Sequence, residues 1–514
     1  MMELLVIGLD GLSTNMLEQF DIDAPYIADV LDESVSGDLM SVDTPTTLPA
    51  WTSFATGKDP GSHGLSNMIQ QSPDYEASPL KTNTTDAAGY DLIDDAMFIN
   101  LPASVERVPA AENTHLVSAM LAEDKRDAVP KYLQELDSFD DYVLDHDKAK
   151  KKRPDEYFDH VCDITRSRRD FAIEAFEMYE PRFGFVLFST PDWAGHLLSN
   201  FSDHETRAKY YQRLLEVVDA CTADVAEMAD NVVLMSDHGF EHKHTNVHVN
   251  DYLRDAGYLR EVGQNGLSVA NLAVETAKTI GKRSAFLYEK IRQVYNYIIA
   301  TDVGQSLQEA AEPDVDYPNS AAWQLRYGCL YINDDRFEHP TVEDPDALKQ
   351  KLRDELADLT DEEGDPLFRA VLLPDEAYAS PGEWAPDVIA RPAPGCYPTM
   401  LESPTGGYAS QTNNYNHRYR GIFAARGPLF ADDGSVEDMS ITDVLPTVIA
   451  GLGVPLSPEF DGAVRKDVLA DDKEFRYREP EAVPAPRTRD DSTTDQAARN
   501  DAVEDRLEDL GYLQ

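Results

Sequence analysis

Six aspartate and histidine residues lie at or beside the ends of short apolar runs along this chain of 514 residues. Carboxylates and imidazoles are ligands that Zn²⁺, Mn²⁺ and Fe accept, and no member of the set is a thiolate. A single aspartate after a strand is more often a turn or helix-cap residue, so the grouping carries the interpretation. Three carboxylates and three imidazoles are enough for two metal sites. The six residues are Asp10, Asp192, His196, Asp237, His238 and His417.

A threonine pair precedes a helix that we expect to begin near Ala50. Two metal ions about 4 Å apart can promote in-line displacement at phosphorus, and such a reaction needs a nucleophile nearby. Thr47 would lie beside the helix N-terminus, where free backbone N–H groups favour an anion and a lowered hydroxyl pKa. Alternatively, Thr46 and Thr47 only cap the helix. The residue chemistry leaves both interpretations open.

The apolar runs that carry these residues indicate buried strands, since they are short and partly β-branched. Helical patterns separate the runs, and this alternation predicts an α/β fold with a doubly wound, mostly parallel sheet and helices on both faces. Ligands bind beyond the carboxyl ends of the strands in such sheets. The expected strands are residues 4–9, 183–189, 232–236 and 421–425, and the expected helices are residues 168–180, 206–228 and 441–452.

The charge balance is strongly acidic, with 45 Lys and Arg against 95 Asp and Glu and a formal net charge of −50. A surface this negative repels phosphate backbones, so nucleic-acid binding by a basic surface is not expected. Excess acid suits solubility in concentrated salt, and we expect a halophilic host. An anionic substrate would need local positive charge at the site, which metal ions can supply.

Four cysteines lie far apart and form no CxxC pair, which argues against a thiolate zinc site or a disulfide framework. The N-terminal apolar run is short and follows an acid, unlike a secretory signal. No run approaches the roughly 18 apolar residues of a membrane-spanning helix. These features predict a cytoplasmic protein without a membrane span. The cysteines are Cys162, Cys221, Cys329 and Cys396.

Five motifs, taken in order, resemble those of the alkaline phosphatase superfamily. The similarity is closest to its type I phosphodiesterase / nucleotide pyrophosphatase branch and extends over about residues 3–465. The resemblance implies an alkaline-phosphatase-like fold and a two-metal phosphoester hydrolase that forms a covalent phospho-threonine. The motifs are LDG at 9–11, TPTTLPAW…TG…P…HG at 44–64, TPDWAGH at 190–196, SDHG at 236–239 and H…GIFAARGP at 417–428.

The resemblance also implies individual roles. The nucleophile would be Thr47, which stands two residues before Pro49 as in the family's T-x-P pattern, with Thr46 as the alternative. Asn67, soon after the HG pair, would contact a phosphate oxygen of the substrate. The two divalent metals would be Zn²⁺, with Mn²⁺ or Fe as alternatives. The implied ligands are Asp192, His196 and His417 for one metal, and Asp10, Thr47, Asp237 and His238 for the other.

Hydrolysis of a small-molecule phosphodiester or pyrophosphate is the favoured activity. A phosphomonoesterase or phosphonate hydrolase on the same core is the alternative, with Arg418 or Arg420 available to hold the extra charge of a monoester. A sulfatase is not expected, because oxidation of a threonine gives a ketone and sulfatases need an aldehyde. A non-catalytic metal-binding scaffold is less expected, since all six ligands and a threonine are present.

We expect one catalytic domain over residues 1–468, with insertions at about 66–160 and 250–395 that cap the site and select the leaving group. Residues 270–307, within the second insertion, have a largely helical pattern. Residues 469–514 are rich in proline and aspartate, which predicts an acidic linker followed by a short C-terminal helix.

Four further histidines could be mistaken for ligands. His242, His244 and His248 follow the SDHG motif closely and resemble a metal-binding tract. The metal positions are already filled by the motif residues, so a structural role is favoured for this tract, with a third-metal or substrate role as the alternative. His63 is expected to pack against the nucleophile helix.

Overall fold

The computed structural model describes most of the chain, which forms two compact units. The first unit contains the described residues of 1–68, 79–241 and 415–488, and the second contains those of 69–78 and 242–414. The predicted helices at 270–307 and near the C-terminus lie outside the described residues. Among the helices that are described, none is long and apolar enough to cross a membrane. The described residues are 1–79, 86–105, 107–120, 122, 124–262, 315–404, 406–432, 434–470 and 474–488.

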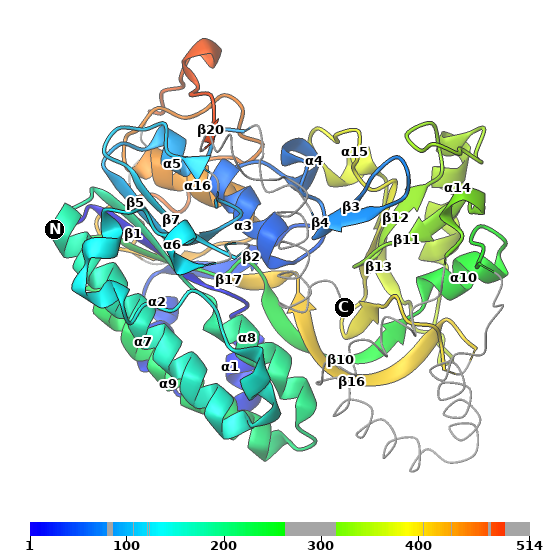
Figure 1. The fold of residues 1–514 in the computed structure, drawn as a ribbon, viewed down its shortest axis with the longest axis horizontal. Coiled ribbons are helices and arrows are strands. Elements are labelled where there is room, and N and C mark those ends of the chain that lie inside the picture. Colours follow the sequence, from blue (N-terminus) through cyan, green and yellow to red (C-terminus); the bar gives the residue numbers. More distant parts are fainter. Residues whose placement is uncertain are drawn as a thin grey trace. The chain divides into compact units, whose positions relative to one another are not determined.

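A sheet of nine strands forms the framework of the first unit (Figure 1). Its strands run in the order β18-β2-β17-β9-β1-β8-β5-β7, and β19 also pairs with β2. Neighbours from β9 to β7 are parallel, while β17 is antiparallel to β9 and β2. The predicted mostly parallel α/β fold is confirmed. The strands are β1 (Leu4–Leu9), β2 (Val35–Met40), β5 (Ala96–Pro102), β7 (His115–Ala119), β8 (Phe183–Phe188), β9 (Val232–Met235), β17 (Arg420–Arg426), β18 (Gly434–Ser435) and β19 (Met439–Ser440).

Helices cover both faces of this sheet. Successive side chains of a strand point to opposite faces; in β1, Leu5 and Ile7 enter one buried apolar cluster, whereas Leu4 and Val6 enter another. Figure 1 shows α7 and α9 on one side of the sheet and α3 and α16 on the other. Each face therefore has its own core. The first cluster draws on α1 (Thr14–Phe20), α2 (Pro25–Asp32), α7 (Pro154–Tyr179), α8 (Thr190–Leu197) and α9 (His204–Ala226), and the second on α3 (Thr47–Thr56), α5 (Gly89–Leu92) and α16 (Ile441–Gly451).

Part of the segment predicted as an insertion at 66–160 belongs to this sheet instead. β5 pairs in parallel with β8, and β7 pairs in parallel with β5. The register of β5 against β7 shifts between Ile99 and Leu101, and Asn100 at this bulge has a φ of 63°. A bulge breaks the regular pattern by which a strand is recognised in a sequence.

The second unit has its own apolar core around a four-stranded antiparallel sheet of order β11-β12-β14-β13. The chain passes from the first unit to the second within β10 (Gly239–Val247) and returns within β16 (Ala409–Arg418). The remaining elements of this unit are β3 (Ile69–Gln71), β4 (Ala77–Pro79), α10 (Val249–Asp255), η5 (Tyr317–Asn319), β11 (Ala322–Gln324), β12 (Cys329–Ile332), α14 (Pro345–Ala357), β13 (Phe368–Leu372), α15 (Pro374–Ala377), β14 (Val388–Pro392) and β15 (Cys396–Pro398).

Short elements complete the first unit. They are α4 (Pro60–His63), β6 (Arg107–Val108), α6 (Lys125–Ala128), the 3₁₀-helices η1 (Leu133–Glu135), η2 (Asp137–Phe139), η3 (Lys148–Lys152), η4 (Leu198–Asn200) and η6 (Pro480–Ala482), and β20 (Arg487–Thr488).

Candidate active site

Asp10 directly follows β1, at the carboxyl edge of the sheet. The next residue, Gly11, has a φ of 71°, a left-handed conformation that favours glycine. Its N–H donates to Asp237 Oδ1 at 3.2 Å, and a Cβ added at Gly11 would lie 3.2 Å from the Cα of Asp192. The glycine therefore lets the ends of the adjacent strands β8, β1 and β9 approach one another closely.

Asp192 stands in the first turn of α8, the helix that follows β8. Pro191 suits this turn, because its missing N–H would have no helical partner there. His196 lies four residues further along the same helix face, and its Nε2 is 3.5 Å from Asp192 Oδ1. The buried Arg168 donates from Nη1 to Ser189 Oγ at 3.1 Å, which fixes the start of α8.

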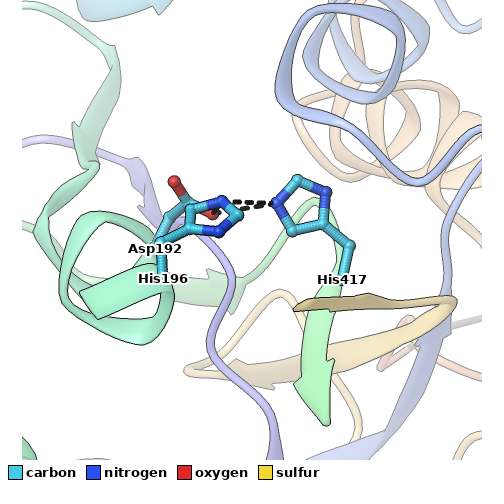
Figure 2. A group of neighbouring side chains, drawn as sticks. All are labelled: Asp192, His196 and His417. Atoms are coloured by element: carbon cyan, nitrogen blue, oxygen red, sulfur yellow. Dashed lines mark hydrogen bonds and ion pairs between the residues drawn. The ribbon is translucent and has the colours of Figure 1, made fainter. Parts of the chain in front are cut away.

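His417 reaches the same place from the antiparallel part of the sheet. It lies near the end of β16, shortly before β17. Because β17 is antiparallel to β9, the residues that precede β17 lie at the edge where β9 ends. His417 Nε2 is 3.0 Å from His196 Nε2 and 3.2 Å from Asp192 Oδ1 (Figure 2). Asp192, His196 and His417 form one group that could hold a metal ion.

Asp237 and His238 follow β9, and His238 contributes to a second group that Asp237 adjoins. His238 Nε2 is 3.2 Å from Asp237 Oδ2, 3.7 Å from Asp10 Oδ1 and 4.0 Å from Asp192 Oδ1. One ligand atom from each of Asp10, Asp192 and His238 lies within 4.8 Å of the others. Because Asp192 belongs to both groups, the structure brings all six predicted ligands into one cluster.

Several atoms of this cluster that could bind a metal are buried and make no hydrogen bond within the described residues. In the described part of the chain, Asp10 Oδ1, Asp192 Oδ1, Asp237 Oδ2 and His238 Nε2 have no hydrogen-bond partner. Buried polar atoms are nearly always hydrogen-bonded, so each exception needs an explanation. Carboxylate oxygens and an imidazole nitrogen that converge in this way fit divalent metal ions, because a cation would satisfy all of them together.

Burial dominates the electrostatics of the cluster. It raises the pKa of Asp10, and the charges of Asp237 and Asp192 raise it further. Burial and the Asp192 charge raise the pKa of Asp237 to about 8. Burial lowers the pKa of His196 to about 3 and lowers the pKa of His238 well below its usual value. Neutral imidazole is the form that binds metal, and the crowded carboxylates favour a nearby cation.

Thr47 is the first residue of α3 and is 2% exposed. Thr46 occupies the N-cap position, but its side chain makes no capping hydrogen bond. Trp51, one turn further along α3, donates from Nε1 to Asp10 Oδ2 at 3.2 Å. Residues four apart share a helix face, so this bond brings the face of α3 that carries Thr47 toward Asp10.

Asn67, the predicted contact to a phosphate oxygen, also lies in the first unit and is buried. Its Oδ1 accepts a hydrogen bond from the Met68 N–H at 2.7 Å. Its Nδ2 has no hydrogen-bond partner among the described residues. The amide therefore has a buried donor available for an anion.

His63 has both ring nitrogens occupied. Its Nδ1 accepts from the Leu65 N–H at 3.1 Å, so Nε2 carries the proton and donates to Ser53 Oγ at 2.8 Å. Burial lowers the pKa of His63 to about 3, which keeps the ring neutral. Because Ser53 belongs to α3, His63 braces this helix, as expected.

Two other candidates from the sequence also have partners. In the second unit, the His248 nitrogens lie 2.7 Å from the Leu401 carbonyl and 2.7 Å from Ser410 Oγ. Arg420, considered as a charge-binding residue for monoesters, forms an ion pair with Asp38 at 2.7 Å on the surface. These contacts give both residues structural roles.

Two residues beside the cluster make contacts that the sequence patterns did not indicate. The bond from Trp51 to Asp10 joins elements far apart in the chain. Arg168 could have been found, because it lies on the apolar face of α7 between Ile164 and Phe171.

The sequence profile of type I phosphodiesterase / nucleotide pyrophosphatase proteins matches residues 4–421. A search of curated proteins finds no match. Among solved structures, murine ectonucleotide pyrophosphatase / phosphodiesterase 5, an inactive threonine-to-alanine variant in complex with AMP, is 13% identical with a TM-score of 0.50, covering 88% of this chain and 96% of that chain.

A second similar structure is phosphonoacetate hydrolase from Sinorhizobium meliloti 1021 in complex with phosphonoformate. It is 13% identical with a TM-score of 0.51, covering 88% of this chain and 95% of that chain. Both proteins share the alkaline-phosphatase-like fold, which confirms the predicted resemblance. The profile match over most of its length shows that the chain belongs to the type I phosphodiesterase / nucleotide pyrophosphatase family of metal-dependent phosphoester hydrolases.

Proposed function

We propose that this chain hydrolyses small phosphodiesters or pyrophosphates with two divalent metal ions held at the Asp/His cluster. The main support for the proposal is that buried carboxylate and imidazole atoms converge around Asp192 and that several of them have no hydrogen-bond partner among the described residues. Bound there, the ions would supply positive charge for a nucleophile and for a leaving oxygen. Asp192, His196 and His417 would hold one ion, and Asp10, Asp237 and His238 would hold the other.

Thr47 is the proposed nucleophile. Its Oγ1 forms a bond to phosphorus while the bond from phosphorus to the leaving oxygen breaks, and water then cleaves the phospho-threonine. The start of α3 supports this role, because free N–H groups and the helix dipole stabilise negative charge there. The link from Trp51 to Asp10 also supports it. The murine protein of similar fold is inactive with a threonine replaced by alanine.

Substrate binding is proposed to involve Asn67. Its unpartnered Nδ2 can donate to a non-bridging phosphate oxygen, while the bond from the Met68 N–H to Oδ1 fixes the orientation of the amide. AMP and phosphonoformate, the ligands of the two similar structures, are both small anions that contain phosphorus. A small phosphoester is therefore the proposed substrate of this chain.

Hydrolysis of an aryl phosphodiester by Thr47→Ala, Thr47→Ser and Thr46→Ala tests the nucleophile. We expect Thr47→Ala to keep its metals and to lose activity on the order of a thousandfold or more. Thr47→Ser should retain part of the activity because it keeps the attacking oxygen, and Thr46→Ala should be much milder. An inactive Thr46→Ala would move the nucleophile one residue earlier. Full activity of both alanine variants would mean that water attacks phosphorus directly.

A phosphonate hydrolase is the second candidate, because the fold is shared with phosphonoacetate hydrolase. A phosphomonoesterase has less support, since Arg420 is engaged by Asp38. Rates with matched aryl diester, aryl monoester and phosphonoacetate substrates separate these activities. A clear preference for phosphonoacetate would favour the second candidate over the first.

We also propose zinc as the metal and a salt-rich cytoplasm as the environment. Imidazole and carboxylate ligands suit Zn²⁺, and the four cysteines are free and buried, as in proteins of reducing compartments. The net charge of −50 should destabilise the fold in dilute buffer through self-repulsion. The melting temperature should therefore rise as KCl is added. A melting temperature that stays constant from low to molar KCl would contradict the salt adaptation.

A further inference from the structure

Two of the proposed metal ligands stand on a helix and a strand, which no strand pairing can join. His196 lies in the last turn of α8, and His417 lies near the end of β16. Their Nε2 atoms are nevertheless 3.0 Å apart (Figure 2). Two imidazole nitrogens on one tetrahedral zinc ion lie about 3.3 Å apart, so this separation suits a shared ion. Other contacts must therefore hold the end of α8 against the end of β16.

The other proposed metal site is fixed by the sheet itself. β1 and β9 are paired in parallel up to Gly8 and Met235, and Asp10 and Asp237 each follow two residues later. Strand pairing sets the distance between residues that stand at equal positions beyond the last pair. The Gly11 N–H adds a hydrogen bond of 3.2 Å to Asp237 Oδ1. This site therefore has a support that the other site lacks.

Ser199 provides a contact between the segments that carry the two histidines. It is the middle residue of η4, three residues after His196. Its Oγ accepts a hydrogen bond from the Tyr415 N–H at 2.9 Å and donates to the Tyr415 carbonyl at 3.4 Å. Tyr415 stands in β16, two residues before His417. One hydroxyl thus joins the backbone of β16 to the end of α8, a few residues from each ligand.

Arg207 of α9 holds both sides of this contact. Its Nε donates to the Leu198 carbonyl at 3.2 Å, and its Nη2 donates to the Phe201 carbonyl at 2.5 Å. Carbonyls at the end of a helix lack helical partners, and a cation there stabilises the end. The same guanidinium lies over the Tyr415 ring, 5.0 Å from its centroid. Because Arg207 and Tyr415 are both buried, they fix η4 and this part of β16 relative to each other.

We propose that Ser199 is a positioning residue that sets the separation of His196 and His417, and thereby the affinity of their site for its metal ion. This inference rests on the proposed function and deepens it, since it assigns a separate support to each of the two sites. Groups that orient metal ligands change metal affinity without binding the ion themselves. Loss of the Ser199 hydroxyl should therefore weaken one ion and leave the other in place.

The test measures the zinc affinity of the metal-free protein by competition with a chelator of known affinity. Ser199→Ala should weaken one of the two ions about tenfold, because loss of a group that orients metal ligands typically costs about 10- to 100-fold. Ser199→Thr should keep the affinity, since it keeps the hydroxyl. Hydrolysis of an aryl phosphodiester by Ser199→Ala should fall at limiting zinc and recover in excess zinc.

Two backgrounds identify the ion that is weakened. In His238→Ala, which removes a ligand of the other site, adding Ser199→Ala should weaken the remaining ion about tenfold. In His196→Ala the same addition should have no effect on the remaining ion, because the ligand that Ser199 positions is absent. Such double-mutant cycles separate an effect on one site from a general loss of stability.

Ser320→Ala is the matched control. In the second unit, Ser320 Oγ accepts a hydrogen bond from the Arg260 N–H at 2.9 Å and donates to the Asp316 carbonyl at 2.8 Å. The substitution removes the same two kinds of hydrogen bond from the same kind of residue. It should lower the melting temperature and leave both zinc affinities unchanged.

Two results would overturn the proposal. Unchanged zinc affinities in Ser199→Ala would show that the hydroxyl does not position the ligands, and equal weakening of both ions would show that Ser199 supports the fold as a whole. In either case the wild type would still bind two ions and hydrolyse the diester, so only the role of Ser199 would fail. A wild type that binds no metal ion at the cluster would contradict the proposed function and this inference together.

Discussion

Two histidines of the stretch 236–250, His238 in the first unit and His248 in the second, look alike in the sequence and differ in their hydrogen bonds. In the first unit, His238 presents a buried Nε2 without a hydrogen-bond partner among the described residues, surrounded by three aspartates. In the second unit, His248 is equally buried, but its ring nitrogens lie 2.7 Å from a carbonyl and from a hydroxyl.

Hydrogen bonding distinguishes a ligand histidine from a structural one in this chain. Burial lowers the pKa of both rings. Only the environment of His238 adds several carboxylates whose oxygen atoms also lack partners. Burial alone therefore does not identify a metal site. A metal site is indicated by several carboxylate and imidazole atoms that converge and make no hydrogen bonds.

The largest loss of metal content and activity is expected from Asp192→Ala. Asp192 is a proposed ligand of one ion, and its carboxylate also lies close to Asp10 and His238 of the other site. Its loss should therefore release the first metal, weaken binding of the second and lower activity about a thousandfold, because bound metals supply several kcal/mol of transition-state stabilisation. Elemental analysis and an aryl phosphodiester assay measure the two effects. A variant that keeps both metal ions and the wild-type rate would show that Asp192 is not a metal ligand.

A smaller effect is expected from Trp51→Phe. The aromatic contacts with Phe54 and Phe185 can persist, while the hydrogen bond to Asp10 is lost. Groups that orient metal ligands typically change activity by about 10- to 100-fold, so we expect kcat to fall about tenfold with little change in KM. An unchanged kcat would show that Trp51 only fills space.

Trp323→Phe is the control for this experiment. Trp323 is also fully buried, and its Nε1 donates to Gln71 Oε1 at 2.7 Å within the second unit. The substitution removes the same kind of bond from the same kind of residue. It should lower the melting temperature and leave kcat close to that of the wild type.

The smallest effect on activity should come from His248→Phe. Two hydrogen bonds are lost and their partners are left unpaired, so we expect a loss of about 1–3 kcal/mol in the free energy of unfolding. Metal content and kcat should stay within about twofold of the wild type. Denaturant unfolding and metal analysis provide the readouts, and a lost metal ion would place His248 in a third site.

The cluster could be predicted from the sequence because its residues stand at strand ends in a recognisable order. Asp10, Asp192 and Asp237 each follow a regular buried strand, so the fold positions them without help from distant side chains. The strands β5 and β7 were missed, since the bulge at Asn100 interrupts the regular pattern.

The hydrogen bond of Trp51 could not be predicted for a different reason. It joins elements distant in the sequence, namely α3 and the end of β1. The periodicity of one segment shows which face is buried and does not show which polar atom that face will meet.

Metal analysis of the purified wild-type protein, combined with activity before and after chelation, shows whether the Asp/His cluster holds two catalytic metal ions. We expect close to two divalent ions per chain, loss of aryl phosphodiester hydrolysis when they are removed, and recovery when zinc is returned. Full activity in a demonstrably metal-free sample would contradict a two-metal site at the Asp/His cluster.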